Sequence, residues 1–257
     1  MIQFMSLVSG SSGNSSLITD GDTTFLIDCG VSGKKLEERL ADVNISPQSI
    51  SGVLITHEHS DHTAGVGVIA RRYSLPLYAT EKTFSAMNIG KISPDLLNPI
   101  CPGKTFSAGS MDIHPFSIPH DAADPVGYSF ITSSGKYTLA TDIGFMPESL
   151  FDHLQGSKQI ILESNHDIEM LRFGSYPYYL KQRILSQKGH MSNELTSKVA
   201  VRLADSGTEN IMLAHLSCEN NTPEIAEITT LNALKSNGFD NVGLTVASRY
   251  AVTQFAV

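Results

Sequence analysis

The 257-residue chain contains no tryptophan and only three cysteines, Cys29, Cys101 and Cys218. An odd number of cysteines without metal-type spacing argues against a disulfide framework, and we expect a reducing, cytoplasmic location. Basic residues are also few, because 18 Lys and Arg stand against 26 Asp and Glu and leave a net charge of −8. This balance excludes a basic architectural nucleic-acid binder and a polybasic membrane anchor.

Long apolar runs are absent as well. No stretch approaches the roughly 18–20 apolar residues of a membrane-spanning helix, so we expect no membrane partner. The first residues, 1–4, carry no basic leader and read as the start of a strand, so we expect no signal peptide. Histidine is the residue in unusual number, with nine in the chain, which points to metal binding.

The chain shows no repeat and no low-complexity linker, and we expect one domain over residues 1–257. Apolar runs and helical patterns alternate irregularly through both halves. This alternation predicts an α/β fold in which helices pack on both sides of two sheets. The local patterns also predict a helix over 33–42 and a helix that begins near Asp61, whose carboxylate caps it, and ends before Pro76.

The segment T-H-E-H-S-D-H, residues 56–62, holds three histidines and one aspartate directly after a short apolar run. His57 and His59 are two residues apart, so in an extended segment they point the same way. Asp61 and His62 begin the next turn and can point back from a different angle. Four ligands this dense fit two adjacent ions better than one, and a single structural zinc would usually take Cys-rich ligation. The alternative is a solvated, polar helix start.

This segment resembles the signature of the metallo-β-lactamase-fold hydrolases, T-H-x-H-x-D-H. The family needs further ligands at the ends of later strands, in a fixed order. The chain fills these three places with His120, Asp142 and His215. The resemblance spans nearly the whole chain, and it implies an αββα sandwich of two mixed sheets flanked by helices.

The resemblance also implies two divalent metal ions and divides seven ligands between them. One ion is bound by His57, His59 and His120, the other by Asp61, His62 and His215, and Asp142 bridges the two. Imidazole and carboxylate ligands suit zinc, manganese or iron, and ligand type alone does not choose between them. Two such ions about 3.5–4 Å apart can share a bridging hydroxide and stabilise a displacement at phosphorus.

His190 stands directly before a predicted helix. A helix N-terminus favours an anion such as phosphate, so we interpret His190 as a proton donor beside bound phosphate. RNase Z-like phosphodiesterases of this superfamily carry a histidine in that place and an acid after the preceding strand, which here is Glu163. The resemblance implies that Glu163 orients His190, and we expect both residues, with Asp61, to act in catalysis.

Four more segments resemble the YycJ/WalJ (VicX-like) branch of this superfamily. They are G-S-S-G-N-S at 10–15, N-H-D at 165–167, G-H-M-S-N at 189–193 and H-L-S-C-E-N-N at 215–221. The branch implies 5′-to-3′ exonuclease action on DNA and a link to DNA repair, through a partner that the sequence does not identify. Candidate substrate contacts are Ser11, Asn14, Asn165, His166, Asn193 and Asn220. The alternative for His166 is a polar surface position.

The negative net charge is an objection to a nuclease, because backbone binding usually needs a basic surface. Two divalent ions would add about four positive charges at the site. Basic side chains that can line an approach are Lys34, Lys35, Arg71, Arg72, Lys181, Arg183 and Lys188. The alternative for each of them, which is favoured residue by residue, is an ordinary solvated surface charge. The resemblance therefore still implies a nucleic-acid substrate, with DNA favoured over RNA.

Two classes of alternative remain. Within the same enzyme class they are RNase Z-like RNA processing and hydrolysis of a cyclic phosphodiester, thioester or lactone. Outside it, the chain would be a metal-binding regulatory protein without turnover. All seven ligand places are filled, which favours an enzyme.

Overall fold

The computed structural model describes residues 2–255, which form two compact units. The first contains residues 2–117, 122–134 and 248–254, and the second contains residues 118–121, 135–247 and 255. Within the described residues the strands form two mixed sheets of seven strands each, which confirms the predicted α/β class. The single domain expected over 1–257 stays a prediction.

The first unit contains one complete sheet. In spatial order its strands are β14 (Thr253–Gln254), β1 (Gln3–Val8), β2 (Ser15–Thr19), β3 (Thr24–Ile27), β4 (Gly52–Leu54), β5 (Leu77–Thr80) and β6 (Leu97–Ile100). Pairing is antiparallel from β14 to β3 and parallel from β3 to β6. Three more strands of this unit pair antiparallel in the order β7 (Phe106–Ala108), β8 (Met111–Ser117) and β9 (Val126–Thr132).

Side chains of β9 pack the strands β7–β9 face to face against the first sheet. The rings of Phe4 in β1 and Phe130 in β9 have centroids 6.3 Å apart, and both side chains are buried. The hydroxyl of Tyr128, also in β9, donates to the carbonyl of Ile55 at 2.8 Å. An aromatic contact and a satisfied buried hydroxyl thus join the inner faces, as in other sheet-on-sheet packings.

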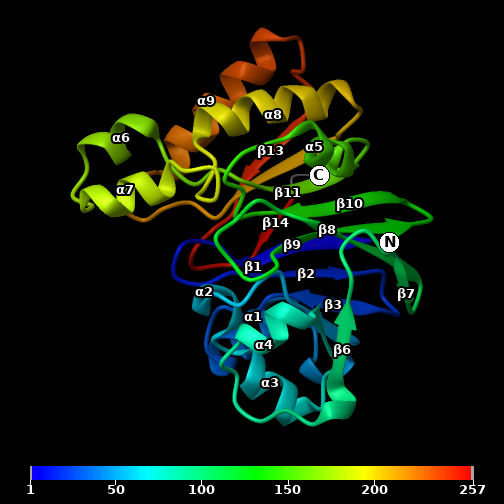
Figure 1. The fold of residues 1–257 in the computed structure, drawn as a ribbon. Helices are drawn as coiled ribbons and strands as arrows, with labels where there is room; N and C mark the ends of the chain where they lie inside the picture. The colour runs from blue at the N-terminus through cyan, green and yellow to red at the C-terminus, as the bar shows by residue number, and fades with distance from the viewer. Residues whose placement is uncertain (1, 256–257) are drawn as a thin grey trace. The chain divides into compact units, whose positions relative to one another are not determined.

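Helices cover the outer face of the first sheet. They are α1 (Gly33–Asp42), α2 (Ser60–Thr63), α3 (Val66–Tyr73) and α4 (Glu81–Ala86), with 3₁₀ turns at Pro47–Ser49 and Pro94–Leu96 (Figure 1). The predicted helix over 33–42 is confirmed. Its N-cap is Ser32, whose hydroxyl accepts from the Lys35 N–H at 3.3 Å. Leu36 and Leu40 lie one turn apart and are fully buried in the core of this unit.

The prediction that a helix begins near Asp61 and ends before Pro76 is confirmed, but the prediction that Asp61 caps it is wrong. The segment forms two helices, α2 and α3, with Gly65 between them, and the N-cap position of α2 is His59 rather than Asp61. The Gly65 N–H donates to the carbonyl of Cys29 at 2.8 Å, and a Cβ at Gly65 would lie 2.2 Å from the Val31 carbonyl oxygen. This close approach of two backbones, which periodicity cannot reveal, interrupts the helix.

The second unit contains four parallel strands, in the order β10 (Gly135–Ala140), β11 (Gln159–Glu163), β12 (Asn210–Ala214) and β13 (Gly243–Val246). Its helices are α5 (Glu148–Leu154), α6 (Ile168–Phe173), α7 (Tyr178–Ile184), α8 (Asn193–Asp205) and α9 (Pro223–Ser236). α8 and α9 lie side by side (Figure 1). Residues 160–162 of β11 are buried, as expected of a parallel strand covered on both faces.

Among residues 2–255, no helix combines the length and the apolar character that a membrane crossing requires.

A buried amide pair connects the start of α8 to the loop after β12. The Asn221 side-chain nitrogen donates to Asn193 Oδ1 at 2.9 Å and to the carbonyls of Ser164 and Asn165 at 2.9 and 3.1 Å. Its oxygen accepts from Asn193 Nδ2 at 2.9 Å and from the Thr222 N–H at 3.0 Å. Removing this side chain would leave several buried polar groups without partners.

We therefore expect Asn221→Ala to lower the free energy of unfolding by about 2–4 kcal/mol. Urea unfolding followed by circular dichroism measures the change. Asn88→Ala is the control, because Asn88 is exposed and its loss should change stability by no more than about 0.5 kcal/mol. Equal midpoints for the two variants would contradict the structural role of the amide pair.

Candidate functional site

In the first unit, polar residues follow two neighbouring parallel strands, β3 and β4. Asp28 comes directly after β3, while Thr56 and His57 come just after β4. The carboxyl ends of parallel strands meet at the same edge of a sheet, which is the usual place for a site in such folds. The segment 56–62 singled out in the sequence therefore lies at this edge.

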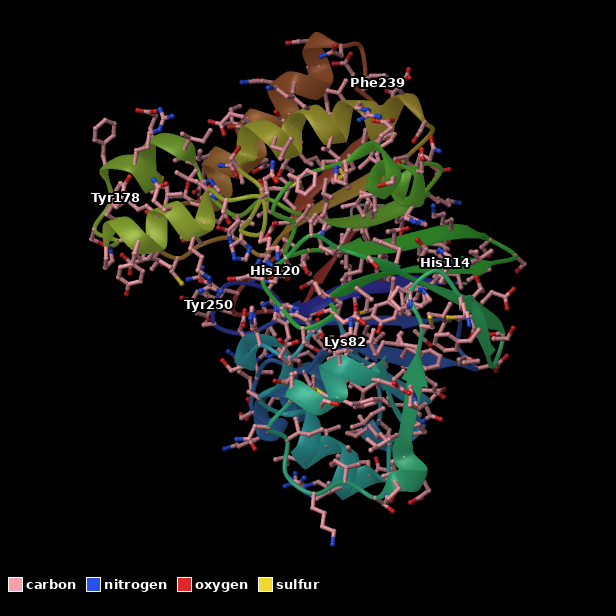
Figure 2. All side chains as sticks on the ribbon, viewed as in Figure 1. Lys82, His114, His120, Tyr178, Phe239 and Tyr250 are labelled. Atoms are coloured by element: carbon pink, nitrogen blue, oxygen red, sulfur yellow. The ribbon has the colours of Figure 1, made fainter. Side chains whose placement is uncertain are left out.

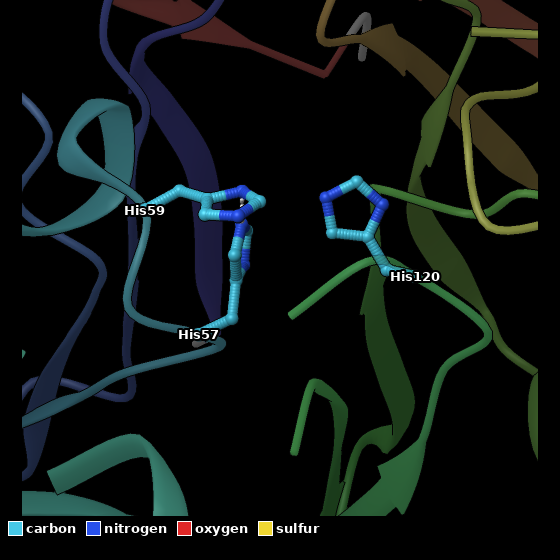
Figure 3. A group of neighbouring side chains, drawn as sticks. All are labelled: His57, His59 and His120. Carbon is cyan, nitrogen blue, oxygen red and sulfur yellow. Dashed lines mark hydrogen bonds between the residues drawn. The ribbon is translucent and has the colours of Figure 1, made fainter. Parts of the chain in front are cut away.

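His57 and His59 approach each other from the loop after β4 (Figure 3). Nε2 of His57 lies 3.1 Å from Nδ1 of His59, and the two rings are almost perpendicular. Two nitrogens bound to one tetrahedral zinc at about 2.0–2.1 Å lie roughly 3.3–3.4 Å apart. The pair therefore has close to the spacing of two ligands on one cation.

His62 is completely buried and is held by an acid that the sequence reading missed. Its Nδ1 lies 2.7 Å from Oδ2 of Asp28, and the same carboxylate accepts from the N–H and the hydroxyl of Thr56, each at 2.8 Å. A carboxylate on one ring nitrogen fixes the tautomer and turns the other nitrogen outward as a ligand. The available signal was an acid directly after the buried strand β3.

Asn14, predicted to contact substrate, lies against two of the predicted ligands. Its side-chain nitrogen is 3.2 Å from Nε2 of His62 and 3.4 Å from Oδ2 of Asp61, and its backbone N–H donates to the Asp61 carbonyl at 2.8 Å. Gly30 makes this approach possible, because a Cβ there would lie 1.6 Å from the Asp61 carbonyl oxygen. Ser11 is exposed in the preceding turn.

In the second unit, four polar side chains meet at the carboxyl edge of the parallel strands. Asp142 and His215 follow β10 and β12, Glu163 is the last residue of β11, and His190 comes shortly before α8. The ligand atoms of these four side chains lie within 4.8 Å of one another. Imidazole and carboxylate groups in this arrangement suit a divalent metal ion.

Glu163 is fully buried and holds two of these histidines. Its Oε1 accepts from Nδ1 of His190 at 2.8 Å and from Nδ1 of His215 at 2.9 Å. Its Oε2 accepts from the backbone N–H groups of Ile143 and Met191 at 2.8 and 3.0 Å. The contact expected with His190 is present, and the contact with His215 is one that the sequence reading missed.

The protonation of Glu163 follows from these contacts. Burial alone would raise its pKa, but the charge and hydrogen bond of His190, with those of His215, outweigh burial and lower the pKa to about 2. An ionised carboxylate can only accept hydrogen bonds, so both Nδ1 atoms carry protons. In each ring Nε2 is then the nitrogen left for a ligand or a substrate.

His120 belongs to the same unit and follows β8. Its Nδ1 lies 3.2 Å from the carbonyl oxygen of Gly189, and its Nε2 lies 3.8 Å from Oδ1 of Asp142. Its ring centroid is 5.1 Å from that of His190. Burial lowers the pKa of His120, which favours the neutral ring that a metal ligand requires.

Three of the residues after strands have left-handed backbones. The φ angles are 61° at Asp28, 63° at Asp142 and 59° at His215. This region is uncommon for residues other than glycine, and such strain tends to gather at functional sites. The turns that place these side chains at the strand ends are therefore maintained by the surrounding contacts.

The other predicted substrate contacts lie in the second unit and differ in their bonding. Asn165 donates to the His215 carbonyl at 2.9 Å, and Asn193 is fully buried in the amide pair with Asn221. His166 and Asn220 are each 1% exposed, and within the described residues none of their side-chain N and O atoms has a hydrogen-bond partner.

His166 is therefore not a surface residue, and the surface interpretation is wrong. Burial lowers its pKa to about 4, so the ring is neutral at neutral pH. A neutral imidazole offers one donor and one acceptor without a charge. Neither this burial nor that of Asn220 has a signal in the local sequence.

The sequence matches a known family over most of its length. Residues 23–216 match the model of the beta-lactamase superfamily domain. Exodeoxyribonuclease WalJ of Streptococcus pneumoniae serotype 2 (strain D39) is 43% identical over 232 residues, which are 89% of this chain and 86% of that protein. Exodeoxyribonuclease YycJ of Bacillus anthracis is 39% identical over 240 residues, 93% of this chain and 91% of that protein.

Solved structures share the fold at much lower identity. The metallo-beta-lactamase fold protein YhfI from Bacillus subtilis is 14% identical, with 98% of this chain and 99% of that chain covered and a TM-score of 0.74. A diphosphatase from the PhnP family is 16% identical, with coverage of 100% and 99% and a TM-score of 0.70. With 39% and 43% of residues identical along most of both curated relatives, the chain belongs to the YycJ/WalJ branch of the metallo-β-lactamase-fold hydrolases.

Proposed function

We propose that this chain is a metal-dependent exonuclease that removes nucleotides from DNA ends in the 5′-to-3′ direction. The observation that carries the proposal is the buried Glu163 carboxylate, which orients His190 and His215 at the carboxyl edge of β11 and β12. Two relatives that bear the name exodeoxyribonuclease support the choice of DNA as the substrate.

The proposed metal centre uses the seven ligands expected from the sequence. One ion would be held by His57, His59 and His120 and a second by Asp61, His62 and His215, and Asp142 would contribute to both sites. The donor set fits zinc or manganese, with iron also compatible. When bound, two such ions would activate a water molecule and neutralise charge that develops on a phosphate.

In this proposal His190 acts on substrate rather than on metal. Its Nδ1 is held by Glu163 at 2.8 Å, so Nε2 is the atom from which a proton would pass to the leaving oxygen. Asp61 would take part in catalysis from the first unit, where Asn14 contacts its carboxylate at 3.4 Å. Glu163 acts through the two rings that it orients.

Substrate contacts are proposed at two kinds of place. Backbone N–H groups of the loop 11–14 or of the start of α8 would bind a terminal 5′ phosphate. The buried polar groups of His166 and Asn220 would hold uncharged hydrogen-bonding groups of the substrate. The small number of cysteines agrees with a cytoplasmic enzyme, and a role in DNA repair with a protein partner belongs to the same proposal.

Elemental analysis should find close to two equivalents of transition metal in protein purified without a chelator. Asp142→Ala should lower the content of both ions, because Asp142 is assigned to both. Asp205→Ala is the control, since Asp205 is exposed at the end of α8. A variant at Asp142 that keeps two full equivalents would remove Asp142 from the centre.

His190→Ala should keep its metal while turnover falls by roughly 10²- to 10⁴-fold, the scale of a lost acid–base group. Glu163→Gln should reduce both turnover and metal affinity, by roughly 10- to 100-fold, because it releases His215 as well as His190. Metal titration and initial rates measure the two effects, with His114→Ala as the control histidine. Loss of metal in His190→Ala would make that residue a ligand.

Linear duplex DNA should be degraded in the presence of Mn²⁺ or Zn²⁺, while covalently closed circular DNA of the same sequence survives. Strands labelled at the 5′ or the 3′ end show the direction of degradation. RNA, a small diester, a thioester and a lactone are tested as alternative substrates. Equal cleavage of both DNA forms would indicate an endonuclease. Turnover of only RNA or a small molecule would move the chain to that alternative, and no turnover would favour a regulatory protein.

A further inference from the structure

The segment that contains α6 and α7 connects two residues of the proposed site. Residues 164–189 leave β11 directly after Glu163 and return at His190, just before α8. Leu171 in α6 and Ile184 in α7 are buried, which attaches both helices to the second unit. Lys181 in α7 also donates to the carbonyls of Arg172 and Gly174 at 2.9 and 2.8 Å. The two helices are thus tied to each other.

Three aromatic side chains on this segment are turned to solvent. Phe173, Tyr178 and Tyr179 are 83%, 77% and 74% exposed. In Figure 2 Tyr178 points outward from α7. Large aromatic side chains are usually buried for most of their surface, and exposed groups of them mark binding sites.

The same segment is positively charged within an acidic chain. Residues 164–189 contain four Lys or Arg and two Asp or Glu, a net charge of +2, whereas the whole chain carries −8. One of the two acids, Asp167, caps α6 by accepting from the Met170 N–H at 2.8 Å. Arg172 directly precedes Phe173, whereas Lys181, Arg183 and Lys188 follow Tyr179 in the sequence. Arg172 pairs with Glu169 at 3.1 Å and Arg183 pairs with Asp121, so these two cations are partly neutralised within the protein.

Exposed rings among cations fit an unpaired nucleic-acid strand, whose bases stack on the rings and whose phosphates are attracted by the cations. A second copy of the chain would instead favour a continuous apolar patch depleted of charge. The segment also runs directly into His190, so a strand bound along it would be led toward the proposed site. We propose that the α6–α7 segment is the surface on which the unpaired part of the substrate strand lies, with its bases stacked on Phe173, Tyr178 and Tyr179.

This inference rests on the proposed function and adds how the strand is held. Every base has a flat face, so stacking tolerates any sequence. It also depends less on salt than phosphate contacts, which release counterions. A chain with few basic residues can therefore hold a strand here without reading its sequence.

Binding tests the inference directly. The probe is a fluorescent single-stranded oligonucleotide with phosphorothioate linkages, and anisotropy measures its affinity for the metal-loaded protein. Phe173→Ala, Tyr178→Ala and Tyr179→Ala should each weaken binding by roughly 5- to 100-fold, the loss of one stacked base. Ile228→Ala is the control, because Ile228 is a 51% exposed apolar residue on α9 of the same unit.

An abasic strand with the same phosphates separates stacking from charge. The wild-type protein should prefer the strand with bases, and the triple variant should bind both strands equally weakly. A triple variant that keeps the full preference for bases would overturn the inference. So would a change in sedimentation from an oligomer to a monomer, because the rings would then form an interface between copies.

A small phosphodiester distinguishes failure of this inference from failure of the proposed function. The triple variant should hydrolyse the small diester at the wild-type rate, while its KM for single-stranded DNA rises and its thermal midpoint stays unchanged. Unchanged KM for DNA in an active triple variant would overturn the inference alone. Loss of small-diester turnover in the triple variant would assign the rings a structural role. A wild-type protein inactive on DNA and diester alike would instead overturn the proposed function.

Discussion

One buried carboxylate organises the polar cluster of the second unit. Glu163 is fully buried and ionised, a state that is costly unless the charge is fully hydrogen-bonded. Four N–H groups satisfy it, two from the backbone and two from the rings of His190 and His215. The same contacts that make the buried charge tolerable also set the orientation and the protonated nitrogen of both rings. The orientation of the His190 and His215 rings therefore follows from the need to satisfy the buried Glu163 carboxylate with hydrogen bonds.

In the first unit, too, a buried carboxylate orients a histidine. Asp28 follows a parallel strand, as Glu163 ends one, and its carboxylate holds His62 while it also accepts from Thr56. In both units the acid lies at the carboxyl edge of parallel strands, where turns from several strands converge. Left-handed backbones at Asp28, Asp142 and His215 belong to these turns. Parallel strand order thus concentrates the polar residues, and buried acids orient them.

Charge in this molecule is better judged locally than from the total. A net charge of −8 suggests poor affinity for a polyanion, yet residues 164–189 carry a net charge of +2 and present three exposed rings. Some basic residues are engaged within the protein: Arg72 pairs with Glu37, and inside this segment Arg172 pairs with Glu169 and Arg183 pairs with Asp121. Stacking and a small number of cations can replace a broad basic surface, because stacking needs no charge.

The sequence by itself determined the family, and it predicts the types and the order of the metal ligands, because the segment 56–62 and the residues after later strands are recognisable from local spacing. Helix 33–42 was also predictable, since its cap and apolar face are local. Only the tertiary structure decided which acids orient which histidines: Asp28 meets His62 across 34 positions, and Glu163 meets His215 across 52. It also decided the helix break at Gly65 and the burial of His166. These features arise where distant segments of backbone come together, and no local pattern encodes such an approach.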